Sequence, residues 1–384
     1  MSKFDTKKGN IGSVVLKILA FFFTFLLVVF LVLYIFCAMA CNKKRPNAQK
    51  TFVTTMLETG QLKFLVSWYL TEAEISEIVA ANSMEDLNEE VDESLIKVKP
   101  QETVYREKVH EVEGGSVTGS KETDDNKGNL ETAADPDGDG VDVFEVTGRS
   151  FSGKMMVVYD PSRLSVSAKY PWGKTGQTLD KFVKNAGAVA GINGGLYEEA
   201  GNTGGMPYGV VISNGEILRN KPKEQKGLVL VGLTEEGILI VENLSGFSET
   251  DVTELVERKK IRDAVCFQEE SSDKNNHFVQ LIINGEKREM NGMGSGLNPR
   301  TAIGQRADGA LLLLVTDGRG ASGHIGASAS DLIALMEEYG AVNAANLDGG
   351  SSSCMYYNGE YLMNSVTFYY ANSSWNMPLA LIVK

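Results

Sequence analysis

Histidine and cysteine are scarce in this chain, which has three histidines and four cysteines among 384 residues. No Cys-x-x-Cys pair and no cysteine–histidine spacing typical of a zinc site occurs, so a zinc centre or a histidine-rich metal cage is not expected. Cys37 and Cys41 belong to the N-terminal apolar segment, and nothing local requires Cys266 and Cys354 to pair. The sequence predicts no metal and no cofactor.

Clustered positive charge is also missing. The chain has 37 Lys and Arg against 50 Asp and Glu, a net charge of −13 at pH 7. Nucleic-acid backbones are bound by clustered Lys and Arg, and the only short basic runs flank the first apolar segment, so nucleic acid is excluded as a partner. The Gly-x-Ser-x-Gly, P-loop and His-Glu-x-x-His motifs are absent as well.

A long, almost unbroken apolar run, interrupted early by Lys17, extends from Val14 to Ala40. It is long enough to cross a hydrocarbon core of roughly 30 Å as a helix, whereas the apolar part of a cleaved signal is about 7–15 residues. We therefore expect a transmembrane signal anchor over residues 11–40. Residues 1–10 would form a short cytoplasmic tail, which places the C-terminal domain outside the cytoplasm. The alternative is cleavage with a lipid on Cys41, because Ala-Met-Ala-Cys41 loosely resembles a bacterial lipobox.

Two segments separate this anchor from the rest of the chain. Residues 41–82 carry apolar side chains at helical spacing, and Thr71-x-x-Glu74 forms a capping box, which predicts a juxtamembrane helical segment or a partner-binding module. Residues 83–140 are acidic and poor in aromatics, which predicts a flexible linker. Its end, residues 135–140, matches the opening of a calcium loop, but Val146 stands where such a loop needs Glu, so a linker turn is the preferred interpretation.

Residues 141–384 have the pattern of an α+β domain, a mixed and largely antiparallel sheet with a few helices. Short β-rich runs recur between Gly and Asn turns, and Asn-Gly pairs at 214, 284 and 358 predict hairpins. The β-rich runs are 154–159, 164–168, 209–213, 228–231, 237–241, 278–283 and 311–316, and the helical patterns are 178–185, 252–259 and 329–339.

Four polar, glycine-rich junctions each follow an apolar run. They lie within residues 190–197, 298–304, 311–319 and 346–352. The last one delivers Asp348 into a Gly/Ser turn, whose backbone N–H groups and hydroxyls suit an oxygen-rich anionic ligand.

Several side chains at these junctions could carry chemistry. Arg300 offers a planar fork for phosphate or carboxylate. His324 is the one histidine near any junction and is a candidate proton carrier. Taken one at a time, each residue also has a simpler interpretation. Arg300 could be a surface arginine, Asp317 part of a strand-end turn, and His324 a solvated loop histidine. Together, two carboxylates, an arginine and glycine turns are the parts needed for acid/base cleavage of an anionic substrate.

The order of these motifs resembles the phosphodiester glycosidase domain family over about residues 141–384. The resemblance implies hydrolysis of a sugar-1-phosphodiester at the glycosidic C1–O bond, and bacterial relatives are often linked to exopolysaccharide. It implies a glycan or sugar-phosphate substrate here. By this resemblance the catalytic candidates are Asn193, Arg300, Asp317 and Asp348, and the substrate-binding candidates are Thr301, Arg319, Gly349, Gly350 and Ser352. His324, which lies near these motifs, is added to the substrate-binding candidates.

Two departures from the family pattern keep other functions open. Ser351 stands where the family's turn commonly has a third glycine, and residues 372–378 lack an arginine that family members usually carry before the last strand. One alternative is a non-catalytic cell-surface module that binds an anionic glycan. Another is a metal-dependent phosphodiesterase that cuts the P–O bond, although the sequence offers no complete metal cage.

Overall fold

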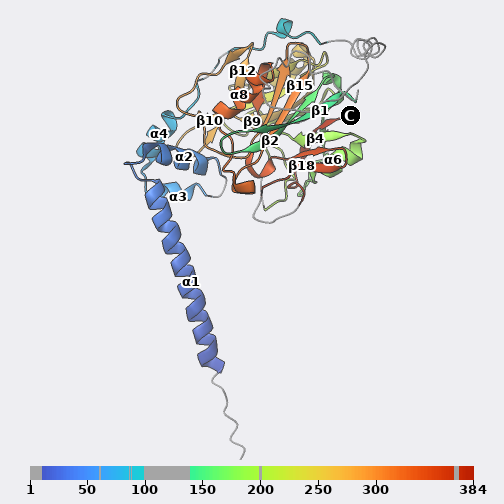
Figure 1. The fold of residues 1–384 in the computed structure, drawn as a ribbon. Coiled ribbons are helices and arrows are strands. Elements are labelled where there is room, and N and C mark those ends of the chain that lie inside the picture. Colours follow the sequence, from blue (N-terminus) through green and yellow to red (C-terminus); the bar gives the residue numbers. More distant parts are fainter. Residues whose placement is uncertain are drawn as a thin grey trace, which may run out of the picture.

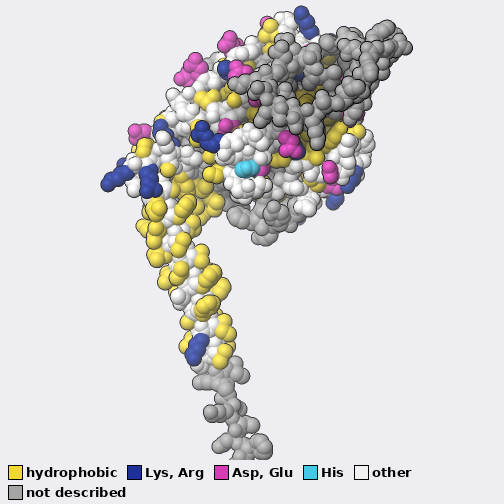
Figure 2. Space-filling model, in the orientation of Figure 1, with side chains coloured by type: hydrophobic (Ala, Val, Ile, Leu, Met, Phe, Trp, Pro, Cys, Tyr) yellow, Lys and Arg dark blue, Asp and Glu magenta, His cyan; other side chains and the backbone are white. Residues whose placement is uncertain are grey.

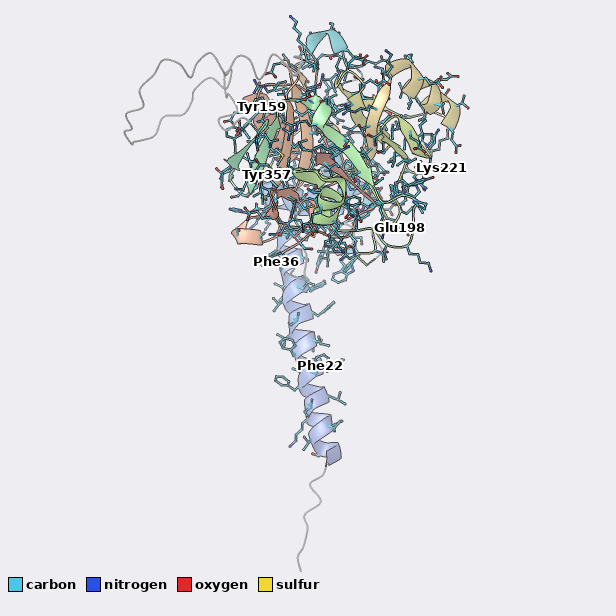
Figure 3. All side chains as sticks on the ribbon, turned by 90° about the vertical axis from the view of Figure 1, so that its right-hand side faces the viewer. Phe22, Phe36, Tyr159, Glu198, Lys221 and Tyr357 are labelled. Atoms are coloured by element: carbon cyan, nitrogen blue, oxygen red, sulfur yellow. The ribbon has the colours of Figure 1, made fainter. Side chains whose placement is uncertain are left out.

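The computed structural model describes residues 11–59, 62–85, 87, 89–98, 139–198, 201–366 and 372–384. One long helix, α1 (Ile11–Ala40), projects away from a sheet domain (Figure 1). Figure 3 shows Phe22 midway along α1, clear of the domain, and Phe36 at the end that meets it. Ser13–Ala40 is long and apolar enough to cross a membrane. The expected helix is present, and its insertion stays a prediction, while the predicted cytoplasmic tail lies outside the described residues.

Three larger antiparallel sheets build the domain, which confirms the predicted α+β class. The seven-stranded sheet has the order β1 (Val141–Thr147), β2 (Ser152–Val158), β15 (Leu311–Thr316), β14 (Thr301–Arg306), β16 (Ala341–Asn346), β12 (Gln280–Ile283), β13 (Glu286–Lys287). The second sheet has the order β18 (Glu360–Met363), β17 (Met355–Tyr357), β4 (Ala190–Asn193), β19 (Leu379–Val383), β3 (Leu164–Ala168). The third has the order β6 (Glu216–Asn220), β5 (Val210–Ser213), β9 (Ile261–Gln268), β7 (Leu228–Thr234), β8 (Leu239–Asn243). Strands β10 (Glu270–Ser271) and β11 (Asn276–His277) form a separate pair.

Each of these three sheets is buried on both faces. One face of every sheet contributes to a single shared core, and the other is covered by one helix: α8 (Ala329–Glu338), α6 (Leu179–Ala186) or α7 (Glu249–Lys259), respectively. Strand β15 shows the consequence, because Leu311 and Leu313 face the shared core while Leu312 and Leu314 face α8. Alternate side chains of a strand point to opposite faces, so this strand is apolar at every position instead of alternating.

The three Asn-Gly pairs form the predicted hairpins. Asn214, Asn284 and Asn358 have φ of 50°, 55° and 47°, and the glycine after each also has positive φ. Two successive residues with positive φ define the tight hairpin turn whose twist matches that of the strands. These turns join β5 to β6, β12 to β13 and β17 to β18.

The juxtamembrane segment is helical, as its pattern predicts. Helices α2 (Pro46–Leu57), α3 (Phe64–Ser67) and α4 (Glu72–Ala80) share a small core that also holds Cys41. The capping box at the start of α4 is present, since the Thr71 hydroxyl accepts from the Glu74 N–H and the Glu74 carboxylate accepts from the Thr71 N–H. These helices also dock on the sheet domain: Thr55 Oγ1 accepts from Leu297 N at 2.9 Å.

The described start of the predicted acidic linker packs on the domain. Val91 and Ile96 are buried, the Glu85 N–H donates to Glu289 O, and the Lys97 N–H donates to Ala307 O. Val91 joins the core that the three sheets share, which the composition alone does not reveal. Residues 99–138, which include most of the calcium-loop match, lie outside the described residues.

Gly296 tests the docking of α2 on the domain. A Cβ at this position would lie 2.5 Å from Thr55 Cα, so Gly296→Ala should push α2 away from the loop that holds it. We expect faster amide hydrogen exchange over residues 46–57 than in the wild type. Gly173→Ala is the matched control, because a Cβ there meets no atom within 4 Å. Unchanged exchange over α2 in Gly296→Ala would contradict this contact.

Candidate functional site

Three of the four polar junctions meet where strand ends of two sheets come together, and the Asn193 side chain bonds to the other two. This buried residue ends β4, and its Oδ1 accepts from Thr301 Oγ1 at 2.7 Å and from Cys354 N at 3.1 Å. Its Nδ2 donates to Asp348 O at 2.5 Å. One side-chain amide thus fixes the start of β14 and both ends of the segment that connects β16 to β17.

The turn that carries Asp348 is held by its backbone. The Asp348 N–H donates to Gly194 O at 3.3 Å, and the Gly350 N–H donates to Pro299 O at 2.8 Å. Gly349 must be small, because a Cβ there would lie 2.9 Å from Pro299 O, and Gly350 has φ of +61°. The Asp348 side chain, on this fixed backbone, is half-buried.

Arg319 reaches the same turn from the loop after β15. Its Nη1 donates to Ser351 Oγ at 2.8 Å and its Nε to Asn298 Oδ1 at 3.3 Å, while the residue as a whole is exposed. Ser351, the departure from the family's third glycine, therefore supplies a hydrogen-bond acceptor to an arginine. The side chain of Arg319 also lies against Gly350, where a Cβ would stand 2.6 Å from Nη2.

The serines that follow support the turn from within. Ser352 is fully buried, and its hydroxyl lies 2.9 Å from the Tyr197 hydroxyl. Ser353 Oγ lies 3.2 Å from Thr301 Oγ1. Burial raises the pKa of the neighbouring Cys354 thiol far above its usual range, so this thiol stays protonated at neutral pH.

Asp317 and His324 form a pair at the end of β15. Asp317 Oδ1 accepts from Ser152 N at 2.8 Å, and Oδ2 lies 2.8 Å from His324 Nδ1. A carboxylate at Nδ1 favours the tautomer with the proton on that nitrogen, which leaves Nε2 as an acceptor when the ring is neutral. The side chain of His324 is 28% exposed against 12% for Asp317, so the histidine is the more accessible of the two.

Strand order places this pair on the same sheet edge as Asp348. β14 lies between β15 and β16, and its first residues pair with the last residues of both neighbours. Asp317 and Asp348 therefore follow strands that are two spacings apart, roughly 10 Å between backbones. The two residues therefore flank the start of β14.

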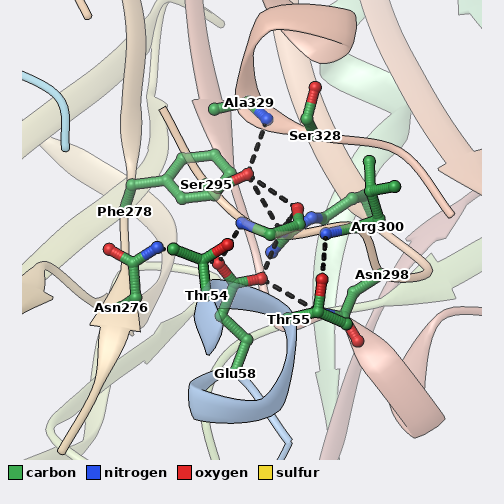
Figure 4. Close-up of polar contacts among 12 residues, drawn as sticks. Thr54, Thr55, Glu58, Asn276, Phe278, Ser295, Asn298, Arg300, Ser328 and Ala329 are labelled. Carbon is green, nitrogen blue, oxygen red and sulfur yellow. Dashed lines mark hydrogen bonds and ion pairs between the residues drawn. The ribbon is translucent and has the colours of Figure 1, made fainter. Parts of the chain in front are cut away.

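Arg300 is placed differently from the exposed phosphate fork that the sequence suggested. The residue is 5% exposed, and its guanidinium pairs with Glu58, which follows the last turn of α2 (Figure 4). Nη2 also donates to Ser295 Oγ at 3.1 Å and Gly296 O at 2.8 Å, and Nε donates to Ala327 O at 3.2 Å. These contacts point the fork into the protein interior.

Glu58 is the residue that sequence reasoning missed. Besides Arg300, its carboxylate accepts from Gly296 N at 2.7 Å, Asn298 Nδ2 at 2.9 Å and Asn276 Nδ2 at 3.0 Å. Its side chain is 2% exposed. No local signal marks it, since its main partner is 242 positions away in the sequence.

Burial shifts the pKa of two ionisable side chains in this region, His277 and Lys63. Burial, reinforced by the positive charges of Lys63 and Arg300, lowers the pKa of His277 to about 4, so this ring is neutral at pH 7. Burial also lowers the pKa of Lys63, whose ammonium donates to Asn275 Oδ1. Among the described residues, no group of three or more His, Cys, Asp or Glu side chains is arranged to hold a metal ion.

Comparison with known proteins finds one family and several distant relatives. The family model described as phosphodiester glycosidase matches residues 186–384, just over half of the chain. A stretch of 67 residues is 43% identical to the SPbeta prophage-derived uncharacterized protein YomE of Bacillus subtilis (strain 168). That stretch is 17% of this chain and only 10% of the relative, so the match spans about a tenth of the curated protein.

Two solved structures resemble the fold at low sequence identity. The zebrafish N-acetylglucosamine-1-phosphodiester alpha-N-acetylglucosaminidase catalytic domain, auto-inhibited by its pro-peptide, has a TM-score of 0.48 and 20% identity, over 63% of this chain and 81% of that one. A hypothetical protein from Synechocystis has a TM-score of 0.38 and 16% identity, over 64% of this chain and 62% of that one.

Replacing Glu58 by Gln should destabilise the protein, because Arg300 would keep a buried charge without its counter-ion. We expect the free energy of unfolding in detergent to fall by about 3–5 kcal/mol. Glu236→Gln, at an exposed pair with Lys260, is the control and should change little. The double variant Glu58→Gln/Arg300→Met should recover part of the loss. A Glu58→Gln protein as stable as the wild type would show that the pair contributes nothing to folding.

Proposed function

Because this chain belongs to the phosphodiester glycosidase family, we propose that it hydrolyses a glycosyl phosphodiester between the anomeric carbon and the phosphate oxygen. Water adds to C1, the C1–O bond breaks, and the products are a free sugar and a phosphomonoester. The observation that carries the proposal is the meeting of Asn193, Thr301 and the Asp348 turn, all family motif residues, at one sheet edge.

Asp348 is the proposed centre of the reaction. Its backbone is fixed on both sides by Asn193 and Gly194, and a carboxylate held in this way can act as a nucleophile or as a general base at C1. The Asp317–His324 pair, on the other side of the β14 start, is the proposed proton carrier. A spacing of roughly 10 Å between the two backbones accommodates a sugar with an attacking water.

Arg319 is the proposed contact for the phosphate. Three groups that the sequence suggested for this role already have partners inside the protein: the Arg300 guanidinium, the Gly350 N–H and the Ser352 hydroxyl. Arg319 also donates to Ser351 and Asn298, but it differs from these groups in being exposed beside the Asp348 turn, where its planar fork suits a phosphate. Arg300 would then act indirectly, because its backbone precedes Thr301 and pairs with Thr316.

The cellular setting is part of the proposal. α1 would anchor the chain in the membrane with the domain outside the cytoplasm, where a surface or exopolysaccharide glycan is the proposed substrate. α1 supports this because most of its apolar side chains are exposed and need an apolar environment.

Product analysis separates this function from its alternatives. A panel of sugar-1-phosphodiesters should yield free sugar and a phosphomonoester, and a chelator should leave the rate unchanged. Sugar phosphate as product, with loss of activity in chelator, would instead identify a metal-dependent phosphodiesterase. Binding without any product would identify a non-catalytic glycan-binding module.

Asp348→Asn should lower turnover by roughly 10²–10⁴ if the carboxylate acts in acid/base chemistry. Asp308→Asn is the control, because Asp308 lies in the β14–β15 turn at the far end of the same strands. Steady-state rates on a cleaved substrate, together with an unchanged thermal midpoint, measure the effect. Undiminished hydrolysis by Asp348→Asn would remove this residue from the mechanism.

A further inference from the structure

An apolar pair, Phe64 at the start of α3 and Trp68 just after its end, points away from the protein. Leu65 and Val66 are buried, Val66 in the core of the juxtamembrane helices, whereas Phe64 is 48% and Trp68 is 43% exposed. Residues four apart lie on the same helix face, and the two rings contact each other with centroids 5.2 Å apart. The other large exposed apolar side chains described outside α1 are Leu95, Tyr170 and Ile325, which are far from this pair in the sequence.

This pair continues the apolar surface of α1. The Trp68 ring lies 5.8 Å from the Phe30 ring, and the next residue, Tyr69, donates its hydroxyl to Tyr34 O at 2.6 Å. Figure 2 shows the hydrophobic side chains of α1 continuing upward to the helices beside the domain. Exposed apolar side chains on α1 extend past Phe30 as far as Met39. Trp68 therefore lies beside a part of α1 that itself needs an apolar environment.

The length of α1 agrees with a bilayer boundary at this level. Thirty residues of helix are about 45 Å long, whereas the hydrocarbon core is roughly 30 Å thick. α1 is therefore longer than the core. A core of roughly 30 Å that begins at the N-terminal end of α1 ends near Phe30, the residue that Trp68 contacts. Trp and Tyr rings are enriched at the membrane surface because they join an apolar ring to a polar group.

We propose that Phe64 and Trp68 form a second membrane contact, in which α3 rests at the boundary between lipid headgroups and acyl chains. This inference rests on the proposed anchoring by α1. Its consequence is a fixed placement of the site, because α2 and α4 are bonded to the loop just before Arg300 through Glu58, Thr55 and Asn82. The domain is held against the bilayer instead of standing off on a flexible stalk.

Tryptophan fluorescence of the full chain in phosphatidylcholine vesicles tests the contact. The chain has three tryptophans, so Trp172→Phe/Trp375→Phe leaves Trp68 as the only one. Its emission should be strongly quenched by phosphatidylcholine that is brominated in the acyl chains. The matched control, Trp68→Phe/Trp375→Phe, leaves Trp172, whose Nε1 donates to Leu218 O in the domain and whose emission should not be quenched.

The proposal would be overturned if brominated lipid left the Trp68 emission unchanged while aqueous acrylamide quenched it. If the double variants misfold, wild type and Trp68→Phe are compared, and the lipid-quenched fraction should disappear in the variant. Flotation with the vesicles reports anchoring by α1, and a chain that fails to float refutes both the anchoring and this contact. Hydrolysis by the same preparation reports the proposed reaction independently of either.

Discussion

The side-chain amide of Asn193 holds the candidate site together. It bonds Thr301 at the start of β14, the backbone of Asp348, and Cys354 at the entry to β17. These contacts come from two different sheets, which are also joined by apolar packing in the shared core and by the hydrogen bond from Asp348 N–H to Gly194 O. Apolar packing is non-directional. The Asn193 amide donates through Nδ2 and accepts through Oδ1, and these directional bonds fix the distances between the groups that it joins. The backbone of Asp348 is therefore held by this buried asparagine together with the bond from its own N–H to Gly194 O.

A second polar contact, the ion pair of Glu58 and Arg300, joins α2 to the loop beside the site. The buried pair of Glu58 and Arg300 fixes the end of α2 against the loop that precedes β14. Arg300 thereby becomes part of the frame, and the exposed arginine beside the Asp348 turn is Arg319. Because a buried charge is costly without its partner, the helices next to α1 and the sheet domain form a single unit. The family match covers residues 186–384, so it includes Arg300 but neither Glu58 nor α2.

Local patterns predicted the fold well, and long-range pairings are what they missed. Asn-Gly turns, the Thr71 capping box and the bounds of β3 and β15 follow from neighbouring residues, and all are present. Asp317 and His324 are close in sequence, and the sequence marks each as a candidate site residue, but it does not predict that they pair. Glu58 could not be found this way, because an isolated acid after a helix has no distinguishing neighbours. The acidic composition of residues 83–140 predicts a flexible linker, and it gives no sign that Val91 and Ile96 at its start are buried.

A crystal structure with a bound sugar phosphonate, in which carbon replaces the bridging oxygen so that the ligand is not cleaved, tests the central claim most directly. The account predicts the sugar C1 within reach of the Asp348 carboxylate and the phosphonate against Arg319, with Glu58 still paired to Arg300. A ligand bound elsewhere would contradict it, for example in the polar hollow lined by Asp180, Lys184 and Tyr361. So would a phosphonate that displaces Glu58 from Arg300.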